Sequence, residues 1–222
     1  MELSNLIQTL FALDTMQRVT VSALPIIFAI TVHEAAHGYA ARYFGDMTAA
    51  AAGRISLNPI RHIDPIGTLL VPAITLLIGG ILFGWAKPVP VDFSRLRNPK
   101  RDMFWVAAAG PGANLVMALL WAFAIKLSPM LPAYAATPLA LMGVAGILIN
   151  VVLMALNLLP LPPLDGGRIA VSLLPTNLAV RFAQIEPYGF IILIVLLFTH
   201  ILDKIMWPFI LVILALISSI FF

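Results

Sequence analysis

Six long apolar stretches limit the fold of this chain more than any other feature of its sequence. A helix needs about 20 predominantly apolar residues to cross the roughly 30 Å hydrocarbon core of a bilayer. Of the 222 residues, 61% are hydrophobic and only 10% are charged, which excludes a soluble globular domain. The sequence therefore predicts an all-α polytopic membrane protein. The stretches are residues 19–44, 66–85, 103–127, 137–161, 188–202 and 205–222.

The lengths of the stretches set the expected core. The first, third and fourth are long enough to span the membrane, so we expect a three-helix catalytic core. The last two are short and need tilt or local thinning of the bilayer to cross it. We expect one membrane-embedded domain over residues 1–222, with its core at about residues 19–185 and two short C-terminal apolar helices at about residues 188–222.

The second stretch, residues 66–85, is interrupted by Pro72, Gly79, Gly80 and Gly84. Non-helical backbone at membrane depth is tolerated where it is buried in protein or lines a wet cavity. We therefore expect a re-entrant segment here. The flanking sequences GRISLNP and KPVPVDF, within residues 51–58 and 86–93, are bounded by turn residues and are typical of short strands.

His33, Glu34 and His37 form the motif HEAAH inside the first apolar stretch. Positions i and i+4 of a helix lie on one face about 6 Å apart along the axis, so two imidazoles there can bind one zinc ion while the glutamate reaches its bound water. Each ionisable group in a transmembrane segment costs about 2.5–3.5 kcal/mol on insertion scales, and coordination of a divalent cation offsets that cost. The motif therefore predicts a metal centre for hydrolysis within the membrane.

A zinc ion held by two histidines needs a third protein ligand and keeps one position for water or substrate in a catalytic site. The chain has no cysteine, so the ligands carry nitrogen or oxygen. Asp165 is the other acidic residue in a comparably apolar setting, within the run NLLPLPPLDGG at residues 157–167. The prolines end the fourth apolar helix, and Gly166 and Gly167 allow a sharp turn after the aspartate. We expect one Zn²⁺ per chain, with Asp165 as its third ligand.

Three motifs in this order resemble the site-2 protease family of intramembrane zinc metalloproteases. They are HEAAH in the first apolar stretch, GPGAN at residues 110–114 and NLLPLPPLDGG after the fourth stretch, and the resemblance covers about residues 20–185. It implies a zinc metalloendopeptidase with His33, His37 and Asp165 as the zinc ligands. The implied substrates are single-span membrane proteins or the remnants of an earlier cleavage.

The resemblance also implies roles for residues outside the ligand set. Glu34 matches the catalytic acid–base residue of the family, and Asn157 matches an asparagine that helps to place the substrate carbonyl or its oxyanion. Asn114 matches a position of less defined role, in the packing of the core helices. The chain is similar to the compact prokaryotic members without a PDZ domain.

The positions of the expected ligands constrain the topology. The histidines lie near the C-terminal end of one helix and Asp165 lies just past the C-terminal end of another, so these helices must run parallel, with one antiparallel helix between them. A fully spanning segment at residues 66–85 would put Asp165 on the opposite face. The loops on the ligand side are basic and the opposite loop has only Lys126, so the positive-inside rule predicts an active site toward the cytoplasmic side of the cell membrane. The basic loop residues are Arg42, Arg54, Arg61, Lys87, Arg95, Arg97, Lys100 and Arg101.

The charge pattern also bears on partners. The net charge is +3, the basic residues are concentrated in these loops, and no helix carries a basic stripe, so the sequence predicts no nucleic-acid partner. The expected partners are a transmembrane protein or peptide substrate and the lipid bilayer. His62 and His200 lie beside charged residues in polar sequence, and we leave them out of the site.

Other classes of membrane protein remain open at this point. A divalent-metal transporter of the membrane also carries paired histidines in a helix, but it needs a second ligand cluster to pass ions along. An inactive zinc-binding scaffold would keep the metal without catalysis. A prenyl-protein protease with HExxH usually takes its third ligand, a glutamate, from a helix, and the run NLLPLPPLDGG supplies none.

Overall fold

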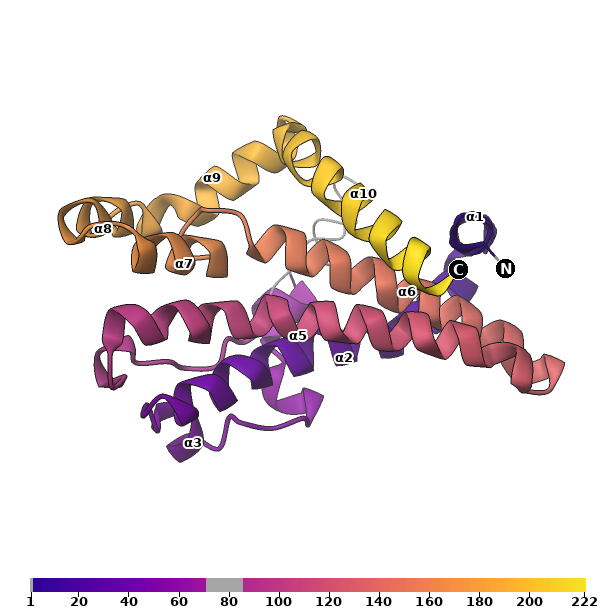
Figure 1. The fold of residues 1–222 in the computed structure, drawn as a ribbon, viewed down its shortest axis with the longest axis horizontal. Helices are drawn as coiled ribbons and strands as arrows, with labels where there is room; N and C mark the ends of the chain where they lie inside the picture. The colour runs from indigo at the N-terminus through magenta and orange to yellow at the C-terminus, as the bar shows by residue number, and fades with distance from the viewer. Residues whose placement is uncertain (1, 71–85) are drawn as a thin grey trace.

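The computed structural model describes residues 2–70 and 86–222 (Figure 1). Their elements are helical, and none of these residues lies in an assigned strand. The α-helices are α1 (Leu3–Ala12), α2 (Thr15–Tyr43), α3 (Thr48–Ala51), α5 (Pro99–Leu127), α6 (Ala133–Asn157), α7 (Asp165–Leu173), α8 (Thr176–Ala183), α9 (Glu186–Phe198) and α10 (Ile201–Phe221). Shorter helical turns are η1 (Pro59–His62), η2 (Pro65–Leu70), η3 (Phe93–Arg95) and η4 (Ser128–Met130).

Helices α2, α5 and α6 contact one another and form the expected three-helix core. Figure 1 shows α2 and α6 running in the same direction, with α5 antiparallel to both. The end of α2 and the residues that follow α6 therefore lie toward the same end of the bundle. This is the arrangement that the positions of HEAAH and Asp165 require.

Small residues let α5 and α6 approach closely. A methyl group on Gly143 would lie closer than 3.0 Å to the Ile125 side chain, and one on Gly146 would overlap the Trp121 ring. Ala118 on α5 is fully buried at the same interface cluster. Because lipid tails are as apolar as side chains, close packing across small residues is a main source of helix association in membranes.

Four helices are long and apolar enough to cross a membrane, namely α2, α5 with its η4 extension, α6 and α10. Helices α8 and α9 pass the same test as a pair, with a bend of 63° between them. The 13 residues of α9 are short, as expected. In contrast, α10 has 21 residues and a rise of about 31 Å. It is longer than the sixth apolar stretch because it begins at Ile201, at the end of the fifth stretch, and continues through Asp203 and Lys204.

The N-terminal helix α1 packs on the core. Leu3, Leu6 and Leu10 lie on one face of α1 and are buried in the main apolar cluster, and α1 contacts α6. Asp14 then starts α2: its carboxylate accepts the Gln17 backbone N–H at 2.9 Å, and the Gln17 side chain accepts the Asp14 backbone N–H at 3.3 Å. This reciprocal cap sharply separates α1 from α2.

The two segments expected to be short strands are extended, but their described residues form no strand pairing. Lys87 donates its backbone N–H to the His62 carbonyl at 2.9 Å, and the Arg54 guanidinium donates to the Lys87 carbonyl at 2.9 Å. Pro88 and Pro90 have no N–H to donate, which prevents a regular ladder here. The re-entrant prediction falls mainly on residues 71–85, which lie outside the described residues.

We predict that Gly146→Ala lowers the stability of the purified protein by about 1–3 kcal/mol, because its methyl group would overlap the partly buried Trp121 ring. Thermal unfolding in detergent measures the change. Gly112→Ala is the matched control, because a methyl group there meets nothing within 4 Å. Equal melting temperatures for the two variants would contradict the proposed close packing of α5 and α6.

Candidate metal centre

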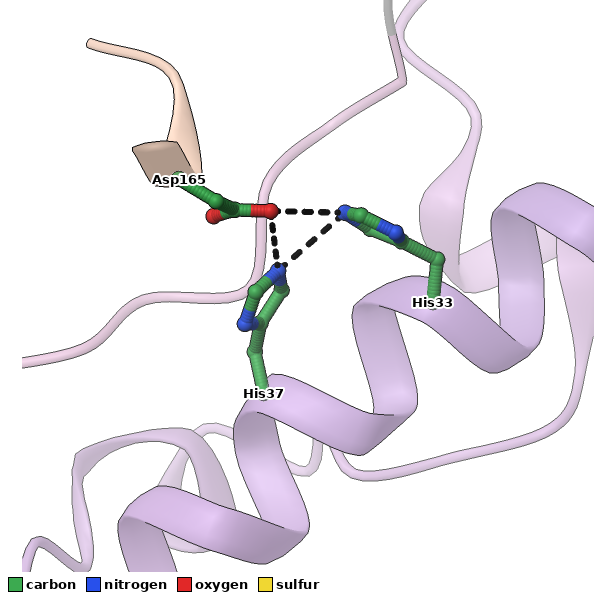
Figure 2. Close-up of side chains that lie close together, drawn as sticks. All are labelled: His33, His37 and Asp165. Atoms are coloured by element: carbon green, nitrogen blue, oxygen red, sulfur yellow. Dashed lines mark hydrogen bonds and ion pairs between the residues drawn. The ribbon is translucent and has the colours of Figure 1, made fainter. Parts of the chain in front are cut away.

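The structure brings together the three residues predicted as zinc ligands. His33 and His37 lie on one face of α2, and their Nε2 atoms are 3.1 Å apart. The Asp165 Oδ2 atom lies 3.3 Å from each Nε2 (Figure 2). The three atoms therefore form a nearly equilateral triangle, and this group could hold a metal ion.

The opposite ring nitrogens fix the state of both imidazoles. His33 Nδ1 lies 2.6 Å from Asn114 Oδ1, and His37 Nδ1 lies 2.8 Å from the Val106 carbonyl. A carbonyl oxygen only accepts hydrogen bonds, so each Nδ1 carries the proton and donates it. With Nδ1 engaged in this way, each ring turns its Nε2 atom toward the centre of the triangle, as metal-binding histidines do.

The geometry and the donor set fit zinc. With Zn–N distances of about 2.0–2.1 Å, a tetrahedral site places its ligand atoms about 3.3 Å apart, close to the distances in the triangle. The side chains of His33, His37 and Asp165 are only 9%, 12% and 16% exposed. Asp165 Oδ2 is buried and accepts no hydrogen bond among the described residues. A buried carboxylate oxygen beside two imidazole nitrogens is a donor set that a cation would stabilise.

Asn114 has a defined role in this structure, and Asn150 extends it. Asn114 Nδ2 donates to Asn150 Oδ1 at 2.8 Å, and Asn150 Nδ2 donates to the Gly146 carbonyl at 2.8 Å. Both asparagines are fully buried. These linked hydrogen bonds between side-chain amides orient the Asn114 oxygen toward His33 and connect α2, α5 and α6. Sequence reasoning missed Asn150, although a polar residue in an apolar helix is itself a signal of an interhelical bond.

The close approach of α5 to the two histidines explains why the motif GPGAN begins with a glycine, Gly110. A methyl group at Gly110 would lie closer than 3.0 Å to the rings of both His33 and His37. Glycine therefore lets α5 pass against the two imidazoles and brings the Val106 carbonyl within reach of His37.

Asp165 is the first residue of α7 and follows a folded turn after α6. Gly166 and Gly167 are buried, and a methyl group on either would overlap the backbone of the preceding turn, at Leu158 and Pro162 respectively. Neither glycine has a positive φ among the described residues. The predicted sharp turn is therefore wrong: the two glycines allow close packing of α7 against the preceding turn.

Arg168 anchors the first turn of α7 to two neighbouring elements. It lies three residues after Asp165, forms an ion pair with Glu186 on α9, and places its guanidinium carbon 5.3 Å from the centre of the Phe93 ring. This residue therefore fixes the first turn of α7, which carries Asp165. The sequence motif gave no indication of either partner.

Glu34 lies on α2 between the two histidines, and its carboxylate accepts the backbone N–H of Val89 at 2.7 Å. The extended segment 86–92 therefore lies beside Glu34. The side chain is partly exposed, so its carboxylate is not enclosed as tightly as the triangle of ligand atoms.

The remaining candidate residues lie apart from these contacts. Asn157, the last residue of α6, donates to the Leu153 carbonyl at 3.0 Å. His62 is buried, at 3% exposed, and bonds through Nε2 to the Ser56 carbonyl. His200 is exposed and pairs with Asp203 on α10.

Comparisons with known proteins agree with this geometry. The profile of Peptidase family M50 matches residues 130–200. The chain is 41% identical over 190 residues to YwhC of Bacillus subtilis (strain 168), covering 83% of both chains. It is 33% identical over 182 residues to Rip2 of Mycolicibacterium smegmatis, covering 80% of this chain and 66% of Rip2. The names of both relatives assign them as zinc metalloproteases. No solved structure matches the chain.

The fold, the ligand triangle and these relatives define an integral membrane metalloprotease whose cofactor is Zn²⁺. The chain belongs to Peptidase family M50, the site-2 protease family. The resemblance found in its motifs is thereby confirmed.

We predict that Asn114→Leu lowers the zinc affinity about 10–100-fold, because His33 loses the acceptor that orients its ring. Asn150→Leu should have a smaller effect in the same direction, since it acts through Asn114. Titration in chelator-buffered zinc measures both. Asn177→Leu, at an exposed position on α8, is the control. Unchanged affinity in Asn114→Leu would contradict the orienting role.

Gly110→Ala should reduce zinc affinity more than about tenfold, because the added methyl group overlaps both imidazoles. The same titration tests it, with Gly112→Ala as the control two residues away. Zinc binding as tight as in the control would show that α5 does not pass as close to the ligands as described.

Proposed function

We propose that the chain is an intramembrane zinc metalloprotease that hydrolyses peptide bonds in or near transmembrane segments of membrane proteins. The convergence of His33, His37 and Asp165 carries this proposal, since two of the three lie on a helix long enough to span a bilayer. These residues would hold the zinc ion. When bound, Zn²⁺ lowers the pKa of its water to about 7 and polarises a substrate carbonyl.

Glu34 is the proposed general base and acid. It is adjacent to His33 in the sequence, and its carboxylate has a single described partner, the Val89 N–H. In the reaction, the carboxylate accepts the proton of the attacking water and passes it to the leaving amine. Asn157 is the proposed donor to the oxygen of the scissile carbonyl. Its side-chain amide has two N–H groups, and the hydrogen bond to the Leu153 carbonyl uses one of them.

The extended segment 86–92 is the proposed receptor for the substrate backbone. A helical substrate has its carbonyls bonded internally, so it must unwind before hydrolysis. An unwound peptide can add to an extended segment through main-chain hydrogen bonds. The Val89 bond to Glu34 places this segment directly beside the proposed base.

The proposed orientation puts the active site toward the cytoplasmic side. The ends of α2 and α5 that lie near the ligands join the loops rich in arginine and lysine, whereas Lys126 lies at the far end of α5. The positive-inside rule favours cytoplasmic placement of the basic loops. The proposed enzyme is a single domain over residues 1–222.

A metal transporter is less well supported. Among the described residues, the search for clusters of metal-binding side chains gives one group, which is the ligand triangle itself. Ion transfer would need a further group on its path. An inactive scaffold has no need for Glu34, yet this carboxylate lies between the ligands.

We predict that Glu34→Gln keeps the zinc ion but slows cleavage of a model transmembrane substrate about 10²–10⁴-fold, the usual contribution of acid–base catalysis. Asp165→Ala should lose both zinc and activity, because it removes a ligand atom of the triangle. Metal analysis and gel-based cleavage in proteoliposomes measure the two properties. Glu2→Gln, an exposed carboxylate far from the site in the sequence, is the control.

Cleavage by Glu34→Gln at the rate of the unmodified enzyme would reject the mechanism. Zinc uptake into the same proteoliposomes that survives Glu34→Gln would favour the transporter.

A further inference from the structure

A second site lies outside the metal centre, in a hollow of 540 Å³ between the end of α3, η1 and the start of segment 86–92. Three of the side chains that line it are cationic: Arg54, Arg61 and Lys87. None of its described lining residues is acidic. The metal-site residues do not line it, so the hollow is separate from the metal centre.

Backbone carbonyls hold Arg54 and Arg61, and no described ion pair neutralises either of them or Lys87. Arg54 donates to the Lys87 and Pro88 carbonyls at 2.9 and 3.3 Å, and Arg61 donates to the Gly53 carbonyl. Among the described residues, no ion pair involves any of the three cations. Arg54 Nε is in addition buried without an acceptor. Three like charges and an unused donor around one hollow favour an anion with several acceptor oxygens.

The rim of the hollow is apolar, which bears on the source of the anion. Ile60 is 73% exposed and Ile63 is 41% exposed, and both line the hollow. A soluble anion gains nothing from these side chains. A phospholipid offers a phosphate to the cations and acyl chains to the isoleucines, and basic residues next to a membrane attract anionic lipids.

We propose that this hollow binds the phosphate of an anionic phospholipid. Phosphate oxygens accept hydrogen bonds from the Arg54 and Arg61 guanidinium groups and from the Lys87 ammonium group. The acyl chains lie against Ile60 and Ile63. The occupant comes from the leaflet that surrounds the basic loops.

The lipid site is linked to the base of the proposed protease, and this link rests on the proposed function. Arg54 holds the carbonyls of Lys87 and Pro88, and the next residue, Val89, donates its N–H to Glu34. A phosphate on Arg54 and Lys87 therefore fixes the segment that contacts the catalytic carboxylate. Anionic lipid thus sets the position of the substrate-binding segment.

The test is native mass spectrometry of the zinc-loaded protein from micelles that contain equal amounts of phosphatidylglycerol and phosphatidylcholine. We expect one retained phosphatidylglycerol and at least a tenfold loss of retention in Lys87→Gln. Lys87 is the variant of choice because only its backbone makes described hydrogen bonds, so the fold stays intact. Arg61→Gln should act in the same direction, and Arg42→Gln, which changes an exposed cation in the last turn of α2 outside the hollow, should not.

Competition separates the sources of phosphate. Inorganic phosphate at 10 mM should leave phosphatidylglycerol retention unchanged; its displacement of the lipid would overturn the lipid assignment in favour of a soluble anion. Equal retention of the two lipids, or equal retention by Lys87→Gln and Arg42→Gln, would overturn the site itself. Because retention is measured without a substrate, these outcomes stand apart from any failure of the protease assignment.

Discussion

The fold depends on the convergence of three buried atoms, the Nε2 atoms of His33 and His37 and Oδ2 of Asp165, in a bundle that is otherwise apolar. Lone pairs that face one another away from water are unfavourable unless a cation joins them. This requirement makes α2 and α6 parallel, since the aspartate must return to the end of the bundle that holds the histidines. It also accounts for Gly110, because α5 has to pass against the rings without a side chain.

Helix α5 organises the centre although it supplies no candidate ligand. The Asn114 side-chain oxygen and the Val106 carbonyl accept hydrogen bonds from the Nδ1 atoms of the two imidazoles. Asn150 of α6 in turn orients Asn114. The aspartate is positioned differently, through the packing of its glycines and the Arg168 ion pair. The two histidines are therefore oriented by polar partners on α5, as metal ligands commonly are, whereas the aspartate is positioned by the packing of α7.

The ligand group and the core topology could be predicted from the sequence because they depend on helix periodicity and on the cost of burying charge. His33 and His37 share a face of any helix, and an acidic residue after a proline-broken span stands out. The contact of Val89 with Glu34 could not be predicted, since a backbone N–H has no signature in the sequence. The burial of His62 was missed for a similar reason, because its acceptor is the Ser56 carbonyl.

The separation of Asp165 from the spanning helices has a consequence for biosynthesis. The histidine pair is made early and the aspartate long after it, once α5 and α6 have been translated. A nascent chain that has inserted only α2 has two imidazoles and no carboxylate to close the triangle. The group of His33, His37 and Asp165 is therefore complete only once α7 has docked on the assembled bundle.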